Sequence, residues 1–277
     1  MVYNIMILAI DMKMVGTAAL VVGVIGLVVG ILLGLAGKVF AVKVDEKELK
    51  VRDELPGNNC GGCGYAGCDD CAKAIAEGKA PANACPVASK EIHQKIAEIM
   101  GVSAEAAERK VAFVKCAGTC EKVVRKYNYD GIQDCKMAKL VPGGGDKACS
   151  YGCLGLGSCV KACQFDAIHI VDGIAKVDTE KCVACGQCVL ECPQHLIELV
   201  PESAKMKVQC ASHDLGPAVM KACSAGCIAC KICEKNCEFD AIHVEDAVAH
   251  IDYEKCTRCG KCAEKCPKKI ITVKFPY

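Results

Sequence analysis

Cysteine is the residue type that could carry most chemistry in this sequence. The chain has 277 residues, of which 26 are Cys, 5 are Phe, 7 are Tyr and none is Trp. Most of the cysteines fall in C-x2-C runs, a spacing that is too tight for long-loop disulfides and suits thiolate ligands of a metal. Because aromatic side chains are scarce, an ordinary apolar core is not expected to hold the chain together alone. We therefore expect metal-bound thiolates in a reducing compartment.

The C-terminal region contains two consecutive four-cysteine motifs, which are Cys227, Cys230, Cys233, Cys237 and Cys256, Cys259, Cys262, Cys266. This is the spacing of bacterial two-cluster ferredoxins, in which three close cysteines bind one [4Fe-4S] cluster and the fourth binds its neighbour. We expect one cluster on Cys227, Cys230 and Cys233 with Cys266, and a second on Cys256, Cys259 and Cys262 with Cys237. Zinc, which needs two C-x2-C pairs per ion, does not explain three close cysteines plus a fourth.

The same pattern occurs 74 residues earlier, with one departure. Leu156 stands where the repeat has its middle cysteine, and Cys149 is the nearest substitute. We expect one cluster on Cys182, Cys185 and Cys188 with Cys163, and another on Cys149, Cys153 and Cys159 with Cys192. Modules of about 50 residues seldom fold by apolar burial alone, so bound metal is expected to supply much of the folding energy.

A fifth group of cysteines lies near the N-terminus, in the pattern Cys60-x2-Cys63-x4-Cys68-x16-Cys85 followed by Pro86. Four thiolates in one compact, glycine-rich segment suit a single [4Fe-4S] cluster. Zinc is the alternative that the spacing leaves open. Cys71, one helical turn beyond Cys68, is expected to be a packed thiol rather than a ligand.

The cysteines that remain outside these groups raise the question of a sixth cluster. We consider it as drawn from Cys116, Cys120, Cys135, Cys210 and Cys223. Cys135 precedes Cys149 by 14 residues and Cys210 precedes Cys223 by 13, so these pairs hold nearly equivalent places in the repeat. Buried or reactive free thiols are the alternative.

Met14–Gly37 is a run of 24 residues with no charge and no proline. As a helix it would be roughly 36 Å long, enough to cross a bilayer with some tilt. A cleaved signal peptide is the rival interpretation, which the length of the run and the lack of a small-x-small cleavage site weaken. Basic residues follow the run more often than they precede it, which places the rest of the chain on the cytoplasmic side: Lys38, Lys43, Lys47, Lys50 and Arg52, against Lys13.

These features predict an α+β protein with a single N-terminal transmembrane helix, a small helical Fe-S domain and two tandem bacterial-type 2[4Fe-4S] ferredoxin modules. The expected limits are 1–37 for the N-terminal segment with its helix at 14–37, 38–55 for a linker and 56–102 for the Fe-S domain. A connecting region with extra cysteines covers 103–147, module 1 covers 148–200, a connector 201–222 and module 2 223–277. Within these, 91–100 has the apolar spacing of a helix, and 111–114 is a short apolar run.

Several functions are excluded by what the sequence lacks. With 34 basic and 33 acidic residues, the chain is not a nucleic-acid binder that works by bulk charge. It has no GxGxxG motif, no P-loop and no readable Ser-His-Asp arrangement, so we expect no catalytic residue and no nicotinamide, flavin or organic-substrate site. A self-sufficient quinone or disulfide reductase and a zinc-stabilised scaffold are the rival classes, and metal analysis would separate the scaffold from an iron-sulfur relay.

An uncharged anchor, then C-x2-C-x4-C-x16-C-P, then tandem ferredoxin modules is an order that resembles the B subunit of the Rnf electron-transport complex. The cysteine-rich stretch from Cys149 to Cys159 resembles the anaerobe-type members. The resemblance implies a complex in the cell membrane that oxidises reduced ferredoxin, reduces NAD+ and pumps Na+ or H+. This chain would then relay single electrons from soluble ferredoxin to its partners, the A, C, D, E and G subunits. A stand-alone membrane-anchored polyferredoxin that serves a different oxidoreductase is the alternative.

Basic residues surround the last cysteine motif, and they are Lys255, Arg258, Lys261, Lys265, Lys268 and Lys269. Such a group could dock an acidic ferredoxin by charge complementarity. A solvated charged face is the alternative, and the sequence does not decide between the two.

Overall fold

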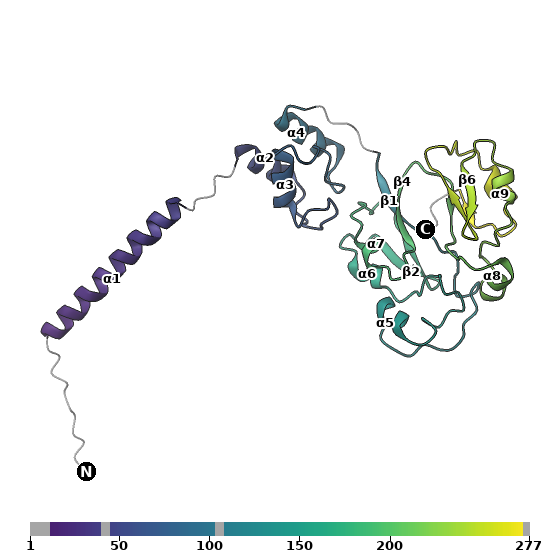
Figure 1. Cartoon of the computed structure of the whole chain (residues 1–277), viewed down its shortest axis with the longest axis horizontal. Helices are drawn as coiled ribbons and strands as arrows, with labels where there is room; N and C mark the ends of the chain where they lie inside the picture. Colours follow the sequence, from purple (N-terminus) through teal and green to yellow (C-terminus); the bar gives the residue numbers. More distant parts are fainter. Residues whose placement is uncertain (1–11, 40–44, 103–107, 274–277) are drawn as a thin grey trace, which may run out of the picture. The chain divides into compact units, whose positions relative to one another are not determined.

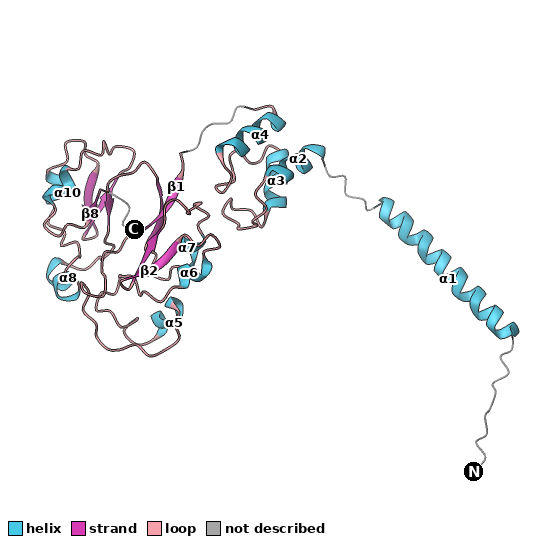
Figure 2. Cartoon of the chain, turned by 180° about the vertical axis from the view of Figure 1, so that it is seen from behind, coloured by secondary structure: helices cyan, strands magenta, loops and turns pink. Residues whose placement is uncertain are grey.

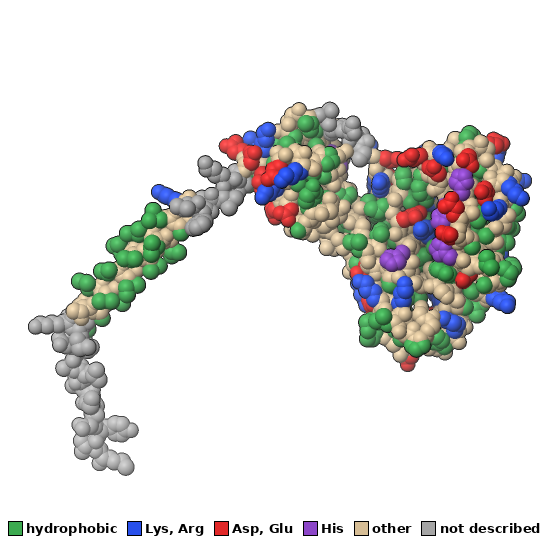
Figure 3. Space-filling view, viewed as in Figure 1, with side chains coloured by type: hydrophobic (Ala, Val, Ile, Leu, Met, Phe, Trp, Pro, Cys, Tyr) green, Lys and Arg blue, Asp and Glu red, His purple; other side chains and the backbone are tan. Residues whose placement is uncertain are grey.

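The computed structural model describes residues 12–39, 45–102 and 108–273, and the chain divides into two compact units at Glu46 (Figure 1). The first unit contains α1 (Met12–Val39), which includes the predicted transmembrane segment. Its stretch Val15–Lys38 has a mean hydropathy of 2.8 and is not buried, and apolar side chains cover the helix (Figure 3). The helix is therefore long and apolar enough to cross a membrane. Lys43 of the predicted basic group lies outside the described residues.

The second unit begins with a small helical domain that consists of α2 (Glu46–Glu54), α3 (Cys68–Ala76) and α4 (Lys90–Met100). Val51, Ile75 and Ile96 from these three helices are almost completely buried in one core. The Ser89 hydroxyl accepts a hydrogen bond from the backbone N–H of Ile92, so α4 begins with a serine cap. The helix predicted at 91–100 is confirmed.

Two modules of the same architecture make up the rest of the unit, and loops connect their short helices and strands (Figure 2). Module 1 pairs β1 (Lys110–Val114) with β4 (Ile197–Pro201) and β2 (Ile168–Val171) with β3 (Ile174–Val177), beside α6 (Ser158–Ala162) and α7 (Gln187–Glu191). Module 2 pairs β5 (Lys207–Val208) with β8 (Ile271–Thr272) and β6 (Ile242–Glu245) with β7 (Val248–Ile251), beside α9 (Ile232–Lys235) and α10 (Lys261–Lys265). All four pairs are antiparallel.

Tight turns close the inner strand pair of each module. Asp172 and Gly173 both have positive φ between β2 and β3, and Asp246 and Ala247 do the same between β6 and β7. Two consecutive residues with positive φ match the right-handed twist of the flanking strands. At Gly173 there is also no space for a side chain, because a Cβ atom there would clash with Cys120 Sγ.

The outer strand pairs join segments that are far apart in the sequence. The predicted module limits, 148–200 and 223–277, leave out β1 and β5, yet each of these strands pairs with the last strand of its module. Phe113 of β1 and Val208 of β5 are buried in their module cores. We therefore propose that module 1 begins near Lys110 and module 2 near Lys207, rather than at the first cysteine motif.

Each module carries an insertion between its first strand and its first cysteine motif, with α5 (Cys135–Leu140) in the first insertion and α8 (Gly216–Ala222) in the second. The segment around Val124 connects them. Its backbone N–H donates to the Ala222 carbonyl at 2.9 Å, and its carbonyl accepts from the backbone N–H of Ala148 at 2.7 Å. The two insertions therefore form a common junction between the modules.

Candidate iron–sulfur centres

None of the 26 cysteines forms a disulfide, and most of them lie in groups around five cavities in the second unit. Module 2 contains two of these cavities. One is lined by Cys227, Cys230, Cys233 and Cys266, and the other by Cys237, Cys256, Cys259 and Cys262. In both, three cysteines from one motif meet the fourth cysteine of the other motif, as the ferredoxin spacing predicts.

The regular half of module 1 has the same arrangement. Cys182, Cys185 and Cys188 line a cavity together with Cys163 of the other motif. The repeat extends to the contacts of the fourth cysteine, because the Ala167 N–H donates to Cys163 Sγ at 3.4 Å and the Ala241 N–H donates to Cys237 Sγ at 3.4 Å. The local sequence after each of these cysteines therefore positions it in the same way.

The irregular half of module 1 differs from the grouping that the sequence suggested. Its cavity is lined by Cys153, Cys159 and Cys192, as expected, but its fourth cysteine is Cys135. Cys149, which we predicted in this place, lines a different cavity at the junction of the modules. We refer to these two as the Cys135 cavity and the junction cavity.

Cys135 reaches its cavity because a hydrogen-bond chain fixes the start of α5. Asp134 caps the helix by accepting from the backbone N–H groups of Lys136 and Met137 at 2.9 and 3.1 Å. Its other oxygen accepts from the Ser158 hydroxyl at 2.9 Å, and the Ser158 oxygen accepts the Cys135 N–H at 2.7 Å. These bonds hold the pKa of Asp134 below its usual value. The hydrogen bond from the Met137 N–H has the largest effect, and the one from Ser158 has the next largest. The carboxylate is therefore a charged, oriented anchor for Cys135.

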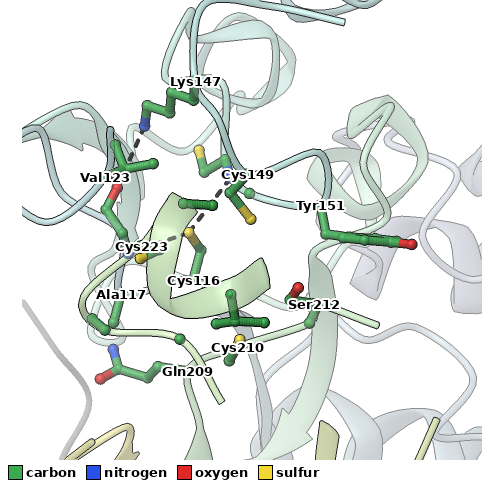
Figure 4. A pocket seen from close by; sticks show the side chains of 18 of the residues that line it. Cys116, Ala117, Val123, Lys147, Cys149, Tyr151, Gln209, Cys210, Ser212 and Cys223 are labelled. Atoms are coloured by element: carbon green, nitrogen blue, oxygen red, sulfur yellow. Dashed lines mark hydrogen bonds between the residues drawn. The ribbon is translucent and has the colours of Figure 1, made fainter. Parts of the chain in front are cut away.

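The junction cavity is lined by Cys116, Cys149, Cys210 and Cys223, with Cys153 at its wall (Figure 4). Three of the five residues considered for a sixth cluster thus lie here together with Cys149. Cys135 lies in the cavity that bears its name, and Cys120 is an exposed thiol that accepts a bond from Arg125 at 3.3 Å.

The N-terminal cysteine group lies around the core of the helical domain. Cys68 and Cys85 are buried there, and Cys63 packs against them. His93 of α4 bonds the Cys85 carbonyl at 2.8 Å, which fixes the backbone at this position. Cys71 is only 1 % exposed, and its pKa is raised to about 12. Burial is the largest cause, and the neighbouring Cys63 is the next. The structure therefore places Cys71 beside the predicted ligands as a neutral thiol.

Burial controls the charge of the cavity thiols. It raises the pKa of Cys153 and Cys233 to about 11 and that of Cys188 to about 12, with neighbouring cysteines adding to the shift at each site. A group of thiolates in such surroundings needs a cation to offset the repulsion, and a coordinated metal deprotonates its thiols. Backbone N–H groups already point at several sulfurs, including Ala112 to Cys182 and Ala175 to Cys153, both at 3.4 Å.

The donor sets fit a cluster better than a single ion. Among the described residues, no group of three or more His, Cys, Asp or Glu side chains is arranged to hold one metal ion. Four thiolates on one zinc must approach to about 4 Å of each other, since each Zn–S bond is about 2.3 Å. Thiolates that share a [4Fe-4S] cluster are separated by the width of the cluster, so cysteines that line one cavity without converging on a single point suit such a cluster.

The helical domain contacts module 1 beside two predicted ligands. Gln187 of α7 donates its side-chain amide to the Cys60 carbonyl. A Cβ atom on Gly62 would lie 2.7 Å from the Cys185 carbonyl oxygen, so the glycine allows the two backbones to approach closely. The N-terminal cysteine group therefore lies next to the regular module 1 cavity.

Sequence reasoning did not group Cys135 with Cys153, Cys159 and Cys192, or Cys149 with Cys116, Cys210 and Cys223, although these residues line common cavities. The signal for Cys149 was in the repeat, because its mate Cys223 has no place in the regular cluster motifs of module 2. For Cys135, Asp134 is a residue type that favours the start of a helix, but no pattern in the sequence predicts the contact between α5 and Ser158.

The fold and the cavities together define the class of this chain as a multi-cluster iron–sulfur protein of the polyferredoxin kind with a candidate membrane helix. Comparison with family models agrees. Residues 175–198 and 249–272 match the model described as "4Fe-4S binding domain", and residues 55–87 match the one described as "Putative Fe-S cluster".

Three curated relatives cover nearly the whole chain. The chain is 47 % identical over 258 residues to the B subunit of the Na+-translocating ferredoxin:NAD+ oxidoreductase complex of Acetobacterium woodii, covering 93 % of this chain and 77 % of the relative. It is 45 % identical to the B subunit of the ion-translocating oxidoreductase complex of Methanosarcina acetivorans, covering 90 % and 95 %. It is 42 % identical to the B subunit of the proton-translocating ferredoxin:NAD+ oxidoreductase complex of Clostridium ljungdahlii, covering 91 % and 89 %. The chain belongs to the family of B subunits of these complexes, the Rnf complexes.

Proposed function

We propose that this chain is the iron–sulfur protein that accepts electrons from reduced ferredoxin and relays them to the other members of a membrane-bound, ion-translocating ferredoxin:NAD+ oxidoreductase complex. The observation that carries the proposal is the set of five cysteine-lined cavities in the two modules, in a member of this family. We propose no site for substrate conversion on this chain. It would relay electrons only, and its partners, the A, C, D, E and G subunits, would hold the sites for substrate conversion.

The five ligand sets that we propose for this function combine the sequence motifs with the cavities. They are Cys60, Cys63, Cys68 and Cys85; Cys135, Cys153, Cys159 and Cys192; Cys182, Cys185, Cys188 and Cys163; Cys227, Cys230, Cys233 and Cys266; and Cys256, Cys259, Cys262 and Cys237. The second set replaces the predicted Cys149 by Cys135, because Cys135 lines the same cavity as the other three.

The protein's contribution is to bind, separate and desolvate the clusters. When bound, a [4Fe-4S] cluster takes up and releases one electron at a time. The chain supplies four thiolates to each, backbone N–H groups aimed at sulfur, and an apolar wall that includes Leu196 and Ile197 on the Cys135 cavity and Ile270 and Ile271 on a module 2 cavity. N–H donors stabilise added negative charge and apolar walls disfavour it, so these residues set the potential.

We further propose that α1 anchors the chain in the cell membrane as a single pass, with the cluster-binding domains on the cytoplasmic side. The basic residues that follow the apolar segment support this orientation. Reduced ferredoxin, a soluble donor, would then reach the modules directly.

The proposed ferredoxin-docking face carries fewer free charges than the sequence suggests. Lys261 forms an ion pair with Glu238, and Lys255 lies 3.8 Å from Asp240. Arg258 donates to the Ser203 hydroxyl at 2.7 Å. Local partners therefore neutralise part of the group, so we expect docking to depend on the remaining positive charge and to weaken with salt.

The decisive experiment is reduction of the purified full-length chain, in detergent and without oxygen, by pre-reduced ferredoxin. We expect the visible absorbance of the chain to bleach with stoichiometric uptake of electrons, and the rate to fall as ionic strength rises. Reversal of charge at Arg258 and Lys261 together should lower that rate, whereas the same change at exposed Lys205 should not. Bleaching by dithionite but not by ferredoxin would overturn the proposed donor and favour a polyferredoxin that serves another oxidoreductase.

A further inference from the structure

The helical domain and module 1 touch through segments that carry a proposed ligand on each side. The side-chain amide of Gln187, at the start of α7, donates to the Cys60 carbonyl. In the same contact, a Cβ atom on Gly62 would lie 2.7 Å from the Cys185 carbonyl oxygen and 2.8 Å from Cys185 Cα. The backbones of Gly62 and Cys185 therefore meet directly, each close to the ligands of its own centre.

Gly62 is required by this contact rather than by its own loop. Gly61 and Gly64 have positive φ values of 69° and 85°, a conformation that favours glycine whatever surrounds it. Gly62 does not have a positive φ, so this reason for glycine is missing at its position. The three atoms nearest to a Cβ there all belong to the backbone of Cys185, at 2.7 to 3.1 Å. Because backbone atoms cannot rotate aside as a side chain can, alanine at position 62 would push module 1 away.

Gln187 forms hydrogen bonds to proposed ligands of both centres. Its backbone N–H donates to Cys185 Sγ, while its side-chain amide donates to the Cys60 carbonyl. The preceding Gly186 has a φ of 79°, and this left-handed residue starts α7 at Gln187. A single residue therefore links a sulfur of the regular module 1 cavity to the backbone of the N-terminal cysteine group.

The thiols of Cys60 and Cys185 lie on the two sides of this contact and influence one another. Burial is the main cause that raises the pKa of Cys185, and the bond from the Gln187 N–H opposes it. Among the cysteines that raise this pKa further, Cys60 has a larger effect than Cys163 and Cys182, which share the cavity of Cys185. Because the Coulomb interaction weakens with distance, Cys60 lies close to Cys185 although it belongs to another domain.

We propose that Gly62 and Gln187 are positioning residues, which hold the N-terminal cysteine group and the regular module 1 centre at the distance that direct electron transfer requires. Cys60 and Cys185 are the facing ligands. This role rests on the proposed relay function and its ligand sets. The step moves one electron, so one site is oxidised and the other is reduced, and no bond forms or breaks. Because electron tunnelling weakens steeply as two centres separate, the close approach at Gly62 controls the rate.

The test compares variants of the full-length chain that are purified in detergent and without oxygen. Gly62→Ala adds the clashing Cβ, and Gln187→Leu removes the amide donor and keeps the length of the side chain. Gly64→Ala is the control in the same loop, since nothing among the described residues lies within 4 Å of a Cβ there. Gln194→Leu is the control on module 1, because its amide donates to carbonyls of that module. All four variants keep every proposed ligand, so their iron and sulfide contents should equal those of the unaltered chain.

Electron paramagnetic resonance of the chain, reduced with titanium(III) citrate, measures the magnetic coupling between neighbouring clusters, which falls steeply with their separation. Cys68→Ser removes a proposed ligand of the N-terminal cluster, so it identifies the part of the coupling that involves this cluster. We expect Gly62→Ala and Gln187→Leu to lose most of that part and both controls to keep it. Rapid-freeze measurements after mixing with the same reductant should show the N-terminal signal rising several-fold more slowly in the two contact variants.

Coupling and transfer rate that stay unchanged in both contact variants, at full iron content, would overturn the proposal. Loss of iron from Gly62→Ala would show that the loop itself requires glycine at this position, which would overturn its role in the contact. Neither measurement uses ferredoxin. Loss of coupling in these variants, in a chain that takes no electrons from ferredoxin when unaltered, would therefore refute the proposed donor while the contact stands. Normal bleaching by ferredoxin with unchanged coupling in both variants would do the reverse.

Discussion

The two modules place the fourth cysteine of one cavity in different ways. In module 2 the middle cysteine of the motif, the proposed ligand Cys230, lies in the loop between Cys227 and Cys233, and it is exposed. In module 1 that position is Leu156, and the cavity is completed by Cys135, which comes from a helix in the insertion. The comparison teaches that a cluster requires four thiolates around one cavity and does not require them to come from one loop.

The replacement also changes the surroundings of the cluster. Cys135 is only 9 % exposed, and it packs with Ala138 and Leu154 in a small core that Leu156 also contacts. Its counterpart in module 2, Cys230, is exposed to solvent instead. Because solvent exposure favours the more negative reduced form of a cluster, we expect the two equivalent clusters to differ in potential.

The largest expected effect comes from removal of the substituted ligand. Cys135→Ser should lose about four iron atoms per chain, as Cys230→Ser should in module 2. Met137→Ala, on the exposed face of the same helix, is the control and should keep its iron. Iron and acid-labile sulfide are measured in chains purified without oxygen.

The same assay tests whether Cys149 shares a cluster with Cys153, Cys159 and Cys192, as the spacing predicted, or belongs to the junction cavity that it lines. If Cys135 and Cys149 hold different clusters, the double variant Cys135→Ser and Cys149→Ser should lose about eight iron atoms. A loss of only about four would mean that both residues serve one cluster, and the division between the Cys135 cavity and the junction cavity would be wrong.

A second prediction converts module 1 into the pattern of module 2. Leu156→Cys in the Cys135→Ser background recreates the spacing C-x2-C-x2-C-x3-C from Cys153 to Cys163. We expect it to recover most of the lost iron, because the loop then presents a thiolate where Cys230 lies in the repeat. Leu156→Ser in the same background is the control. Equal iron in the two variants would show that the loop of module 1 cannot present a ligand at this position.

Some of this organisation follows from local sequence and some does not. The regular motifs place their cysteines through short loops, so Cys182 to Cys188 could be grouped from spacing alone. Cys135 lies 18 residues before Cys153, and its position depends on the contact between Asp134 and Ser158, which no local pattern reveals. The sequence did not predict that β1 and β5 belong to the modules for the same reason. Each strand pairs with the last strand of its module, which is far away in the sequence.

A smaller effect on the module 1 cluster is expected when the hydrogen bonds that position Cys135 are removed and its thiol is kept. Ser158→Ala deletes the acceptor of the buried Cys135 N–H and the donor to Asp134. Leaving such groups unpaired costs about 2 kcal/mol, so the visible absorbance should be lost at a lower temperature than in the unaltered chain. Ser89→Ala, which removes a helix cap in the N-terminal domain, should leave the electron paramagnetic resonance signal of the module 1 cluster intact. An unchanged signal and stability in Ser158→Ala would contradict this anchoring role.

The smallest expected effect concerns a position where the modules differ in charge. Phe113 of β1 and Lys207 of β5 hold equivalent places, because the residue two positions later donates its backbone N–H to the carbonyl of Leu196 in module 1 and to that of Ile270 in module 2. Both are buried, with Lys207 Nζ 6.0 Å from the Phe113 ring. Burial lowers the pKa of Lys207 from 10.5 to about 8. Because the folded state then binds fewer protons than the unfolded state between these two values, stability should rise with pH through that window.

Lys207→Met should remove this dependence. Below pH 8 the lysine is charged in both states and its desolvation cost is fully present, so the variant should be more stable than the unaltered chain by about 1 kcal/mol. The difference should shrink as pH rises towards 10, where the folded lysine is neutral. Thermal unfolding curves at a series of pH values measure it, and Lys205→Met, at an exposed neighbour, is the control. A difference that stays constant or grows with pH would show that Lys207 remains charged in the fold, held by the Phe113 ring and the Ala204 carbonyl.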